Sequence, residues 1–140
     1  MDRRNLAKED LDSVKFDILV RFMIVAAERK RLVEYGELTK VFGISLQDLR
    51  DYAKWLGDYC VSVGKPPLSA LIVNTTDGRP GDDYYVWYSS THGMEKKDAD
   101  SAWGKSVADC FVSYKVPINN AKRFENIAKI SKSISTFLNK

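Results

Sequence analysis

Residues 34–64, EYGELTKVFGISLQDLRDYAKWLGDYCVSVG, decide the fold, because two helical patterns meet there at Gly43. The pattern before this glycine predicts a short helix over 35–42, and glycine is the usual residue just past a helix end. Ser45 then serves as the N-cap of a longer helix that continues toward Gly64. A short helix, a turn and a longer helix in this order predict a helix-turn-helix.

The longer helix presents an apolar seam and a mixed outer face. Its apolar residues recur at steps of three and four, which places them on one side of the helix: Leu46, Leu49, Ala53, Leu56, Cys60 and Val63. In a DNA groove its outward residues would be Gln47, Asp48, Arg50, Asp51, Lys54 and Asp58. Arg50 and Lys54 are candidate DNA contacts, whereas the three carboxylates oppose an approach to phosphate.

Tyr52, Trp55 and Tyr59 lie on the same helix, displaced from the apolar seam. Exposed tryptophan flanked by tyrosine is typical of a protein-interaction surface. The three residues are therefore the candidate protein-binding residues. The other interpretation is that the first or last helix covers them, which would make them core.

Residues 65–88 predict a β-hairpin that would form the wing. Two prolines precede the apolar run LSALIV over 68–73, which has the length of a strand. DGRPG over 77–81 is a turn signal, and the aromatic run YYVWY over 84–88 has high β propensity. Arg79 in this turn is a further candidate DNA contact. The predicted fold class is α+β, a mostly helical winged-helix-like domain with a small aromatic-rich hairpin.

The first helix, predicted over 12–31, carries two apolar stripes. The main stripe is the expected core face: Phe16, Leu19, Val20, Met23, Ala26 and Ala27. The second stripe consists of Ile18, Phe22 and Val25 on the opposite side. A helix that is apolar nearly all round is either central in its domain or part of a homodimer seam, and both interpretations stay open.

Two further helices are predicted over 98–114 and 119–138. The inward residues of the first are Ala102, Trp103, Val107, Cys110 and Phe111. The core positions of the second are Phe124, Ile127, Ile130 or Ser131, Ile134 and Phe137. Residues 118–140 hold five Lys or Arg against one acid, Glu125. Lys122, Lys129 and Lys132 share a broad face that could follow a phosphate backbone or simply be solvated. We expect a single domain over 1–140, with the winged-helix-like core over 12–114 and a basic helix over 118–140.

The composition is that of a globular protein without a membrane segment. The chain has 140 residues, of which 44% are hydrophobic, and a formal net charge of +3. No apolar run approaches the ~20 residues that cross a bilayer, and the N-terminus has no apolar leader, so a cytoplasmic protein is predicted. Two cysteines, Cys60 and Cys110, lie in apolar helical patterns and are expected to be buried thiols.

Side chains for catalysis or metal binding are sparse. Two cysteines and one histidine cannot make a four-ligand Cys/His zinc site. His92 lies in a polar stretch without a recognisable acid partner, and Asp77, Asp82 and Asp83 match no calcium-loop spacing. A solvated histidine and a solvated turn are the favoured interpretations. No catalytic residue, metal or cofactor is therefore predicted, and a small metal nuclease using the three aspartates ranks last.

The pattern YGEL, then PPLSALIVN, then GRPG resembles a small winged-helix-type domain of uncharacterised bacterial and phage proteins, sometimes joined to nuclease or restriction modules. The matching residues are Tyr35, Gly36, Glu37, Leu38, Gly43, Pro67, Leu68, Leu71, Val73, Asn74, Gly78, Pro80, Gly81 and Trp103. The resemblance implies the fold and a DNA-linked context more than an activity. Together with the helix order, it leads us to expect a non-enzymatic module that binds DNA or a DNA-processing complex. The alternative is a phage-type inhibitor or adaptor that binds a host protein through the aromatic face, without DNA contact.

Overall fold

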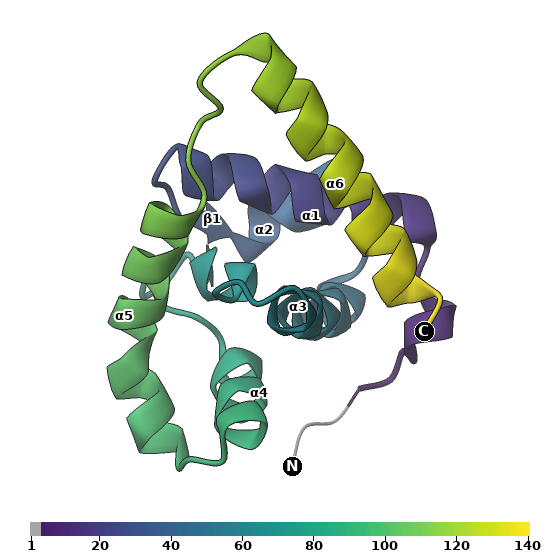
Figure 1. Ribbon diagram of the computed structural model, residues 1–140. Coiled ribbons are helices and arrows are strands. Elements are labelled where there is room, and N and C mark those ends of the chain that lie inside the picture. Colours follow the sequence, from purple (N-terminus) through teal and green to yellow (C-terminus); the bar gives the residue numbers. More distant parts are fainter. Residues whose placement is uncertain (1–3) are drawn as a thin grey trace.

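The computed structural model describes residues 4–140 (Figure 1). This part of the chain folds into six α-helices, two 3-10 helices and two short strands. The α-helices are α1 (Ser13–Glu28), α2 (Tyr35–Phe42), α3 (Leu46–Ser62), α4 (Asp82–His92), α5 (Lys96–Ser113) and α6 (Asn120–Leu138). The other elements are η1 (Lys8–Asp10), η2 (Leu68–Leu71), β1 (Val33–Glu34) and β2 (Ile72–Val73). The fold is therefore mostly helical with a very small sheet.

Local capping signals place several helix ends close to their predicted positions. The Asp12 carboxylate accepts hydrogen bonds from the backbone N–H groups of Val14 and Lys15, which starts α1. The Ser45 hydroxyl accepts from the N–H of Asp48 and starts α3. Gly43 ends α2 with φ of 62°, a left-handed conformation that glycine adopts without steric cost.

Helix α3 lies in the middle of the domain, where Figure 1 shows it nearly end-on. The seam prediction is confirmed at its centre, because Leu49, Ala53, Leu56 and Cys60 are buried. It is wrong at the two ends of the helix. Leu46, the first residue of α3, and Val63, just past its last residue, are exposed there.

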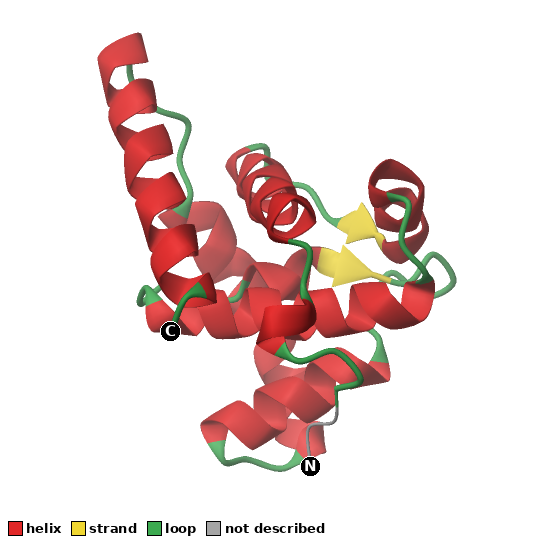
Figure 2. Ribbon diagram, turned by 90° about the vertical axis from the view of Figure 1, so that its right-hand side faces the viewer, coloured by secondary structure: helices red, strands yellow, loops and turns green. Residues whose placement is uncertain are grey.

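The predicted hairpin is wrong. The run 68–73 forms the 3-10 helix η2 and then the two-residue strand β2. β2 pairs in parallel with β1, in the register Val33 to Ile72 and Glu34 to Val73 (Figure 2). The partner strand of β2 is therefore β1, which follows α1 in the chain. A hairpin prediction misses this pairing because it considers only strands that are adjacent in sequence.

The stretch YYVWY is not a strand but the body of helix α4. Asp82 and Asp83 occupy its first turn, where carboxylates are favoured by the helix dipole, and Gly93 ends it with φ of 64°. The aromatic side chains also fit a helical period, since Tyr84 and Trp87 are three residues apart and both buried. His92, which the sequence places in a polar stretch, is therefore the last residue of α4, and only a short link separates α4 from α5.

Helix α4 packs closely on α3 and forms a second, smaller core cluster. Trp87 is almost fully buried, and its indole N–H donates to the Asp58 carboxylate over 2.8 Å. The approach is possible because Gly57 has no side chain: a Cβ there would lie 2.5 Å from the Trp87 ring. Ala70 and Ala99 complete the cluster from η2 and α5.

The first and last helices are covered less completely than predicted. The main stripe of α1 is buried as expected. In its second stripe, Phe22 contacts Phe42 of α2 with ring centroids 6.0 Å apart, while Ile18 and Val25 are exposed. Of the predicted core positions of α6, Ile134 and Phe137 are buried, but Phe124 and Ile127 are exposed. Figure 2 shows why: the N-terminal half of α6 stands away from the other helices.

Candidate functional site: a groove beside helix α6

The two DNA-contact candidates of α3 lie beside the same carboxylate of α4. Arg50 Nε lies 3.3 Å from Oδ2 of Asp83, and Lys54 Nζ lies 3.8 Å from Oδ1 of the same carboxylate. Lys54 is also buried. Lys54 is therefore withdrawn from the surface, whereas Arg50 stays exposed beside Asp83.

The acids of α3 have structural partners as well. Asp51 is buried and accepts hydrogen bonds of 2.9 Å from the backbone N–H groups of Asn5 and Leu6. Asp58 accepts from Arg4 over 2.7 Å and from the Trp87 indole. The expectation of an outward position is therefore wrong for Asp51 and Lys54, which the N-terminal segment and α4 cover, while Asp58 stays partly exposed.

Arg79 anchors the 74–81 loop to α5. Its guanidinium forms an ion pair with Asp100 and lies 5.2 Å from the centroid of the Trp103 ring. The hydrogen bond from Arg79 lowers the pKa of the Asp100 carboxyl. Arg79 is nevertheless partly exposed, so its role in the domain is that of a loop anchor with an accessible edge.

The candidate lysines of α6 lie along an exposed helix face. Glu125 lies 2.9 Å from Lys129 Nζ and 3.4 Å from Lys122 Nζ, and these cations lower the pKa of its carboxyl. Lys132 is exposed and lines a shallow hollow of about 290 Å³ together with Lys129 and Lys140. The predicted basic face of α6 therefore exists, with one carboxylate at its centre.

The predicted aromatic interaction surface is wrong, and the alternative of a covered stripe is confirmed. Tyr52 and Tyr59 are buried, and Trp55 is half-buried. The N-terminal segment covers Trp55, whose indole N–H donates to the carbonyl of Leu6 over 3.0 Å. Phe137 of α6 covers Tyr59, with ring centroids 5.7 Å apart.

The residues considered for chemistry do not assemble into a reactive site. Within residues 4–140, no group of three or more His, Cys, Asp or Glu side chains is placed to hold a metal ion. His92 is the exposed last residue of α4, with its ring 4.2 Å from that of Tyr88. Cys60 and Cys110 are buried free thiols, and burial raises the pKa of Cys60 to about 11.

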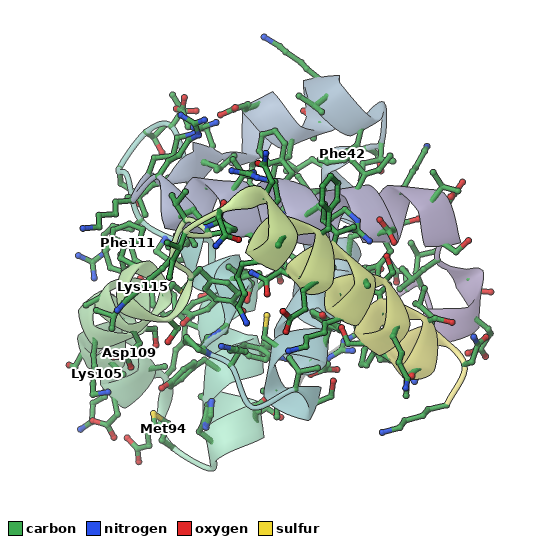
Figure 3. All side chains as sticks on the ribbon, turned by 45° about the horizontal axis from the view of Figure 1, so that its top comes forward. Phe42, Met94, Lys105, Asp109, Phe111 and Lys115 are labelled. Atoms are coloured by element: carbon green, nitrogen blue, oxygen red, sulfur yellow. The ribbon has the colours of Figure 1, made fainter. Side chains whose placement is uncertain are left out.

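A groove of about 600 Å³ lies beside α6. One wall is α1, and the opposite wall is the link from α5 to α6 with the N-terminal half of α6. Figure 3 marks Lys115 at the point where the chain leaves α5 toward α6. The apolar surface of the groove comes from residues far apart in sequence: Ile24, Val25, Val63, Tyr114, Ile127 and Ile130.

Two hydrogen bonds fix the position of α6 over the rest of the domain. Arg21 of α1 donates to the Ser131 hydroxyl over 2.7 Å, and the Tyr59 and Ser133 hydroxyls lie 2.6 Å apart. Both bonds fall in the C-terminal half of α6, next to the buried Ile134. The N-terminal half consequently extends past its attachment, which leaves the groove open between this half and α1.

The groove combines uncovered apolar side chains with a mostly basic rim. Val25 and Ile127 are 45% and 44% exposed. The charged residues lining it are Arg21, Glu28, Lys65, Lys115, Arg123 and Lys129. Burial raises the pKa of the Glu28 carboxyl, while nearby Arg123 acts in the opposite direction. A groove of this size and character is suited to binding an apolar group that carries negative charge.

Sequence reasoning did not find this groove. Its residues come from α1, α3, α5 and α6, and no single segment shows more than one wall. One sequence signal was available: Phe124 and Ile127 are apolar residues among the lysines and arginine at the start of the last helix. The prediction that both are core residues is wrong, because no other helix covers this half of α6.

Comparisons with known proteins find no match for this chain among protein-family models, curated proteins or solved structures. In the part of the chain that the structure describes, no helix has both the length and the apolar character needed to span a membrane.

Proposed function

We propose that this protein is a non-enzymatic binding module that receives an apolar segment of a partner protein in the groove between α1 and α6. The observation that carries this proposal is the set of uncovered apolar side chains on both walls, Val25 on one and Ile127 on the other. Grooves that leave apolar side chains in water are characteristic of binding surfaces, because covering them releases free energy. The proposed partner is again a protein, but it binds the groove and not the aromatic stripe of α3.

The proposal is tested with a synthetic amphipathic helix as the probe. The probe has about 18 residues, leucines along one face and glutamines on the other, so that only apolar contact drives binding. We expect saturable binding by fluorescence anisotropy, and a loss of at least about 10-fold in affinity for Val25→Gln and for Ile127→Gln.

Val112→Gln is the matched control. Val112 is exposed on α5 and does not line the groove, so this substitution removes a comparable valine from another surface. Equal weakening by Val112→Gln, or no binding of the probe at all, would contradict the proposal. Circular dichroism of each variant ensures that a change in affinity is not a loss of fold.

Nucleic-acid binding is the second candidate, favoured by the basic face of α6. The contact would rest on the exposed face of α6, where Lys122, Lys129 and Lys132 outnumber Glu125, the one acid that Lys122 and Lys129 share. Replacing these three lysines with alanine should then weaken binding of duplex DNA at every sequence and flatten the salt dependence by about one unit per lost phosphate contact. Absence of binding at ~50 mM salt, where electrostatic attraction is strong, would remove this candidate. The bacterial or phage setting and a homodimer remain predictions.

A further inference from the structure

The charges around the groove identify the chemistry of its occupant, on the premise that the groove is the binding site proposed above. Two of the lining cations are already matched by acids beside the groove. Arg21 Nε lies 2.6 Å from Asp17, and Lys129 Nζ lies 2.9 Å from Glu125. An occupant would gain little from these two, because the existing pairs already satisfy them.

Three further cations lie on the rim, and one of them, Arg123, already faces the Glu28 carboxyl, whose pKa it acts to lower. Lys65, Lys115 and Arg123 are exposed, and no salt bridge within residues 4–140 engages them. Lys65 lies over the Tyr114 ring, 5.7 Å from its centroid, so its ammonium is held at the edge of the apolar surface. Against these cations, Glu28 is the one acid among the described residues that line the groove.

We propose that the groove binds an acidic amphipathic helix of another protein. The apolar face of this helix would pack between Val25 and Ile127, and its Asp or Glu side chains would reach Lys65, Lys115 and Arg123. Helices bind in grooves through apolar residues at steps of three and four, while charges at the rim select the partner and its orientation.

A second copy of this chain is a poor occupant, although α6 itself has an uncovered apolar face. Phe124 is 68% exposed, but it is accompanied on α6 by Lys122, Arg123 and Lys129 against the single acid Glu125. Docking this helix into a basic groove would bring like charges together. Nucleic acid fits the rim but not the apolar walls, since a phosphate backbone has no apolar face to cover Val25 and Ile127.

The experiment compares three synthetic helices that share one leucine face. Their polar faces carry glutamate, glutamine or lysine, and each is about 18 residues long. We expect the glutamate helix to bind at least about 10-fold more tightly than the glutamine helix at ~50 mM salt, and the lysine helix to bind most weakly. The difference should shrink at ~0.5 M salt, because screening reduces attraction between exposed charges.

Substitutions in the rim test the charge assignment directly. Lys115→Glu combined with Arg123→Glu should weaken the glutamate helix by at least about 10-fold and strengthen the lysine helix. Glu28→Gln should have the opposite effect and strengthen the glutamate helix a few-fold, because it removes the acid inside the groove. Lys40→Glu combined with Lys97→Glu is the matched control, since it changes the net charge equally at exposed lysines outside the groove.

The outcomes separate this inference from the proposal on which it rests. If all three helices bind equally and Ile127→Gln weakens each of them, the groove is a binding site but its charge preference is refuted. If none of the three helices binds, the proposed function is refuted, and the charge preference is refuted with it. Tighter binding of an 18-bp DNA duplex than of the glutamate helix, unaffected by Ile127→Gln, would overturn the inference in favour of nucleic acid.

Discussion

Helices α3 and α6 have similar lengths but differ strongly in how much of each is buried. α3 has 17 residues, nine of them buried, whereas α6 has 19 residues, only two of them buried. α3 is covered by α1, α2, α4, α6 and the N-terminal segment, while α6 rests on the domain only through its C-terminal half. α3, which the sequence presents as a candidate DNA-binding helix, is the centre of the core. α6, which was expected to complete the core, leaves an open groove.

The residues that stabilise the fold and the residues that are free to contact a partner lie on different helices. Beyond the first turn of α3, its acids and bases have partners in other segments. Asp51 and Asp58 bind the N-terminal segment, and Arg50 and Lys54 lie beside Asp83 of α4. The uncovered apolar residues of α1 and α6 contribute little to the core and remain available for a partner. Stability therefore rests mainly on α3, and the binding function that we propose lies at the groove beside α6.

Amide hydrogen exchange should show the largest contrast between the two helices. The amides of Leu49 to Cys60 should exchange only through global unfolding, with a protection free energy of roughly 5 kcal/mol or more. Those of Arg123 to Ile127 should open locally with a protection of about 2 kcal/mol or less, because their side chains are hardly packed. Equal protection along both helices would show that α6 is packed over its full length.

Two phenylalanines of α6 provide a matched pair of substitutions. Phe137 is 7% exposed and stacks on Phe16 with ring centroids 5.8 Å apart, whereas Phe124 is largely exposed. Phe137→Ala should lower the free energy of unfolding by about 3 kcal/mol, and Phe124→Ala by less than about 0.5 kcal/mol. Urea denaturation of the two variants measures both values. A comparable loss for the two would mean that the N-terminal half of α6 also belongs to the core.

Alkaline pH should destabilise the core around α3. Burial raises the pKa of Tyr35 from 10.0 to about 12 and that of Cys60 from 9.0 to about 11. Between each pair of values the unfolded chain loses its proton while the folded chain keeps it, so stability is full below the lower value and falls as the pH rises toward the higher one. Each group should remove about 1.4 kcal/mol per pH unit inside its window.

The measurement is the melting temperature as a function of pH from about 8 to 12, together with tyrosinate absorbance. Tyr35→Phe should flatten the fall between about pH 10 and 12, because phenylalanine has no proton to lose. An unchanged pH profile in this variant would indicate that Tyr35 is accessible to water in the folded protein.

Two helical glycines should respond in opposite directions to the same substitution. Alanine is a better helix former than glycine by about 1 kcal/mol, and Gly104 of α5 has open space where a Cβ would stand. Gly104→Ala should therefore raise the free energy of unfolding by about 0.5 to 1 kcal/mol. Gly57→Ala should lower it by about 1 kcal/mol, since the strain of displacing the Trp87 ring exceeds the gain in helix propensity. Stabilisation by both would show that α3 and α4 can separate slightly.

Much of the secondary structure could be predicted because its signals are local. Asp12 and Ser45 cap helices where expected, and Gly43 ends α2. The hairpin prediction is wrong at YYVWY because it relied on the high β propensity of these residues. The segment is flanked by helix signals, two aspartates at its start and Gly93 at its end, and it forms a helix. Propensity is a weak guide when a segment's own caps and aromatic spacing point the other way.

The sequence by itself determined where most helices begin and end and which face of α1 is core, because caps and apolar periodicity act within a few residues of each other. Only the tertiary structure decided that β1 and β2 pair in parallel, that the aromatic stripe of α3 is covered, and that α6 is attached by one half. These outcomes depend on contacts between segments such as Arg21 and Ser131, 110 residues apart along the chain. The groove follows from the same cause: its walls are built from four helices and a connecting link, and no local pattern encodes the space between them.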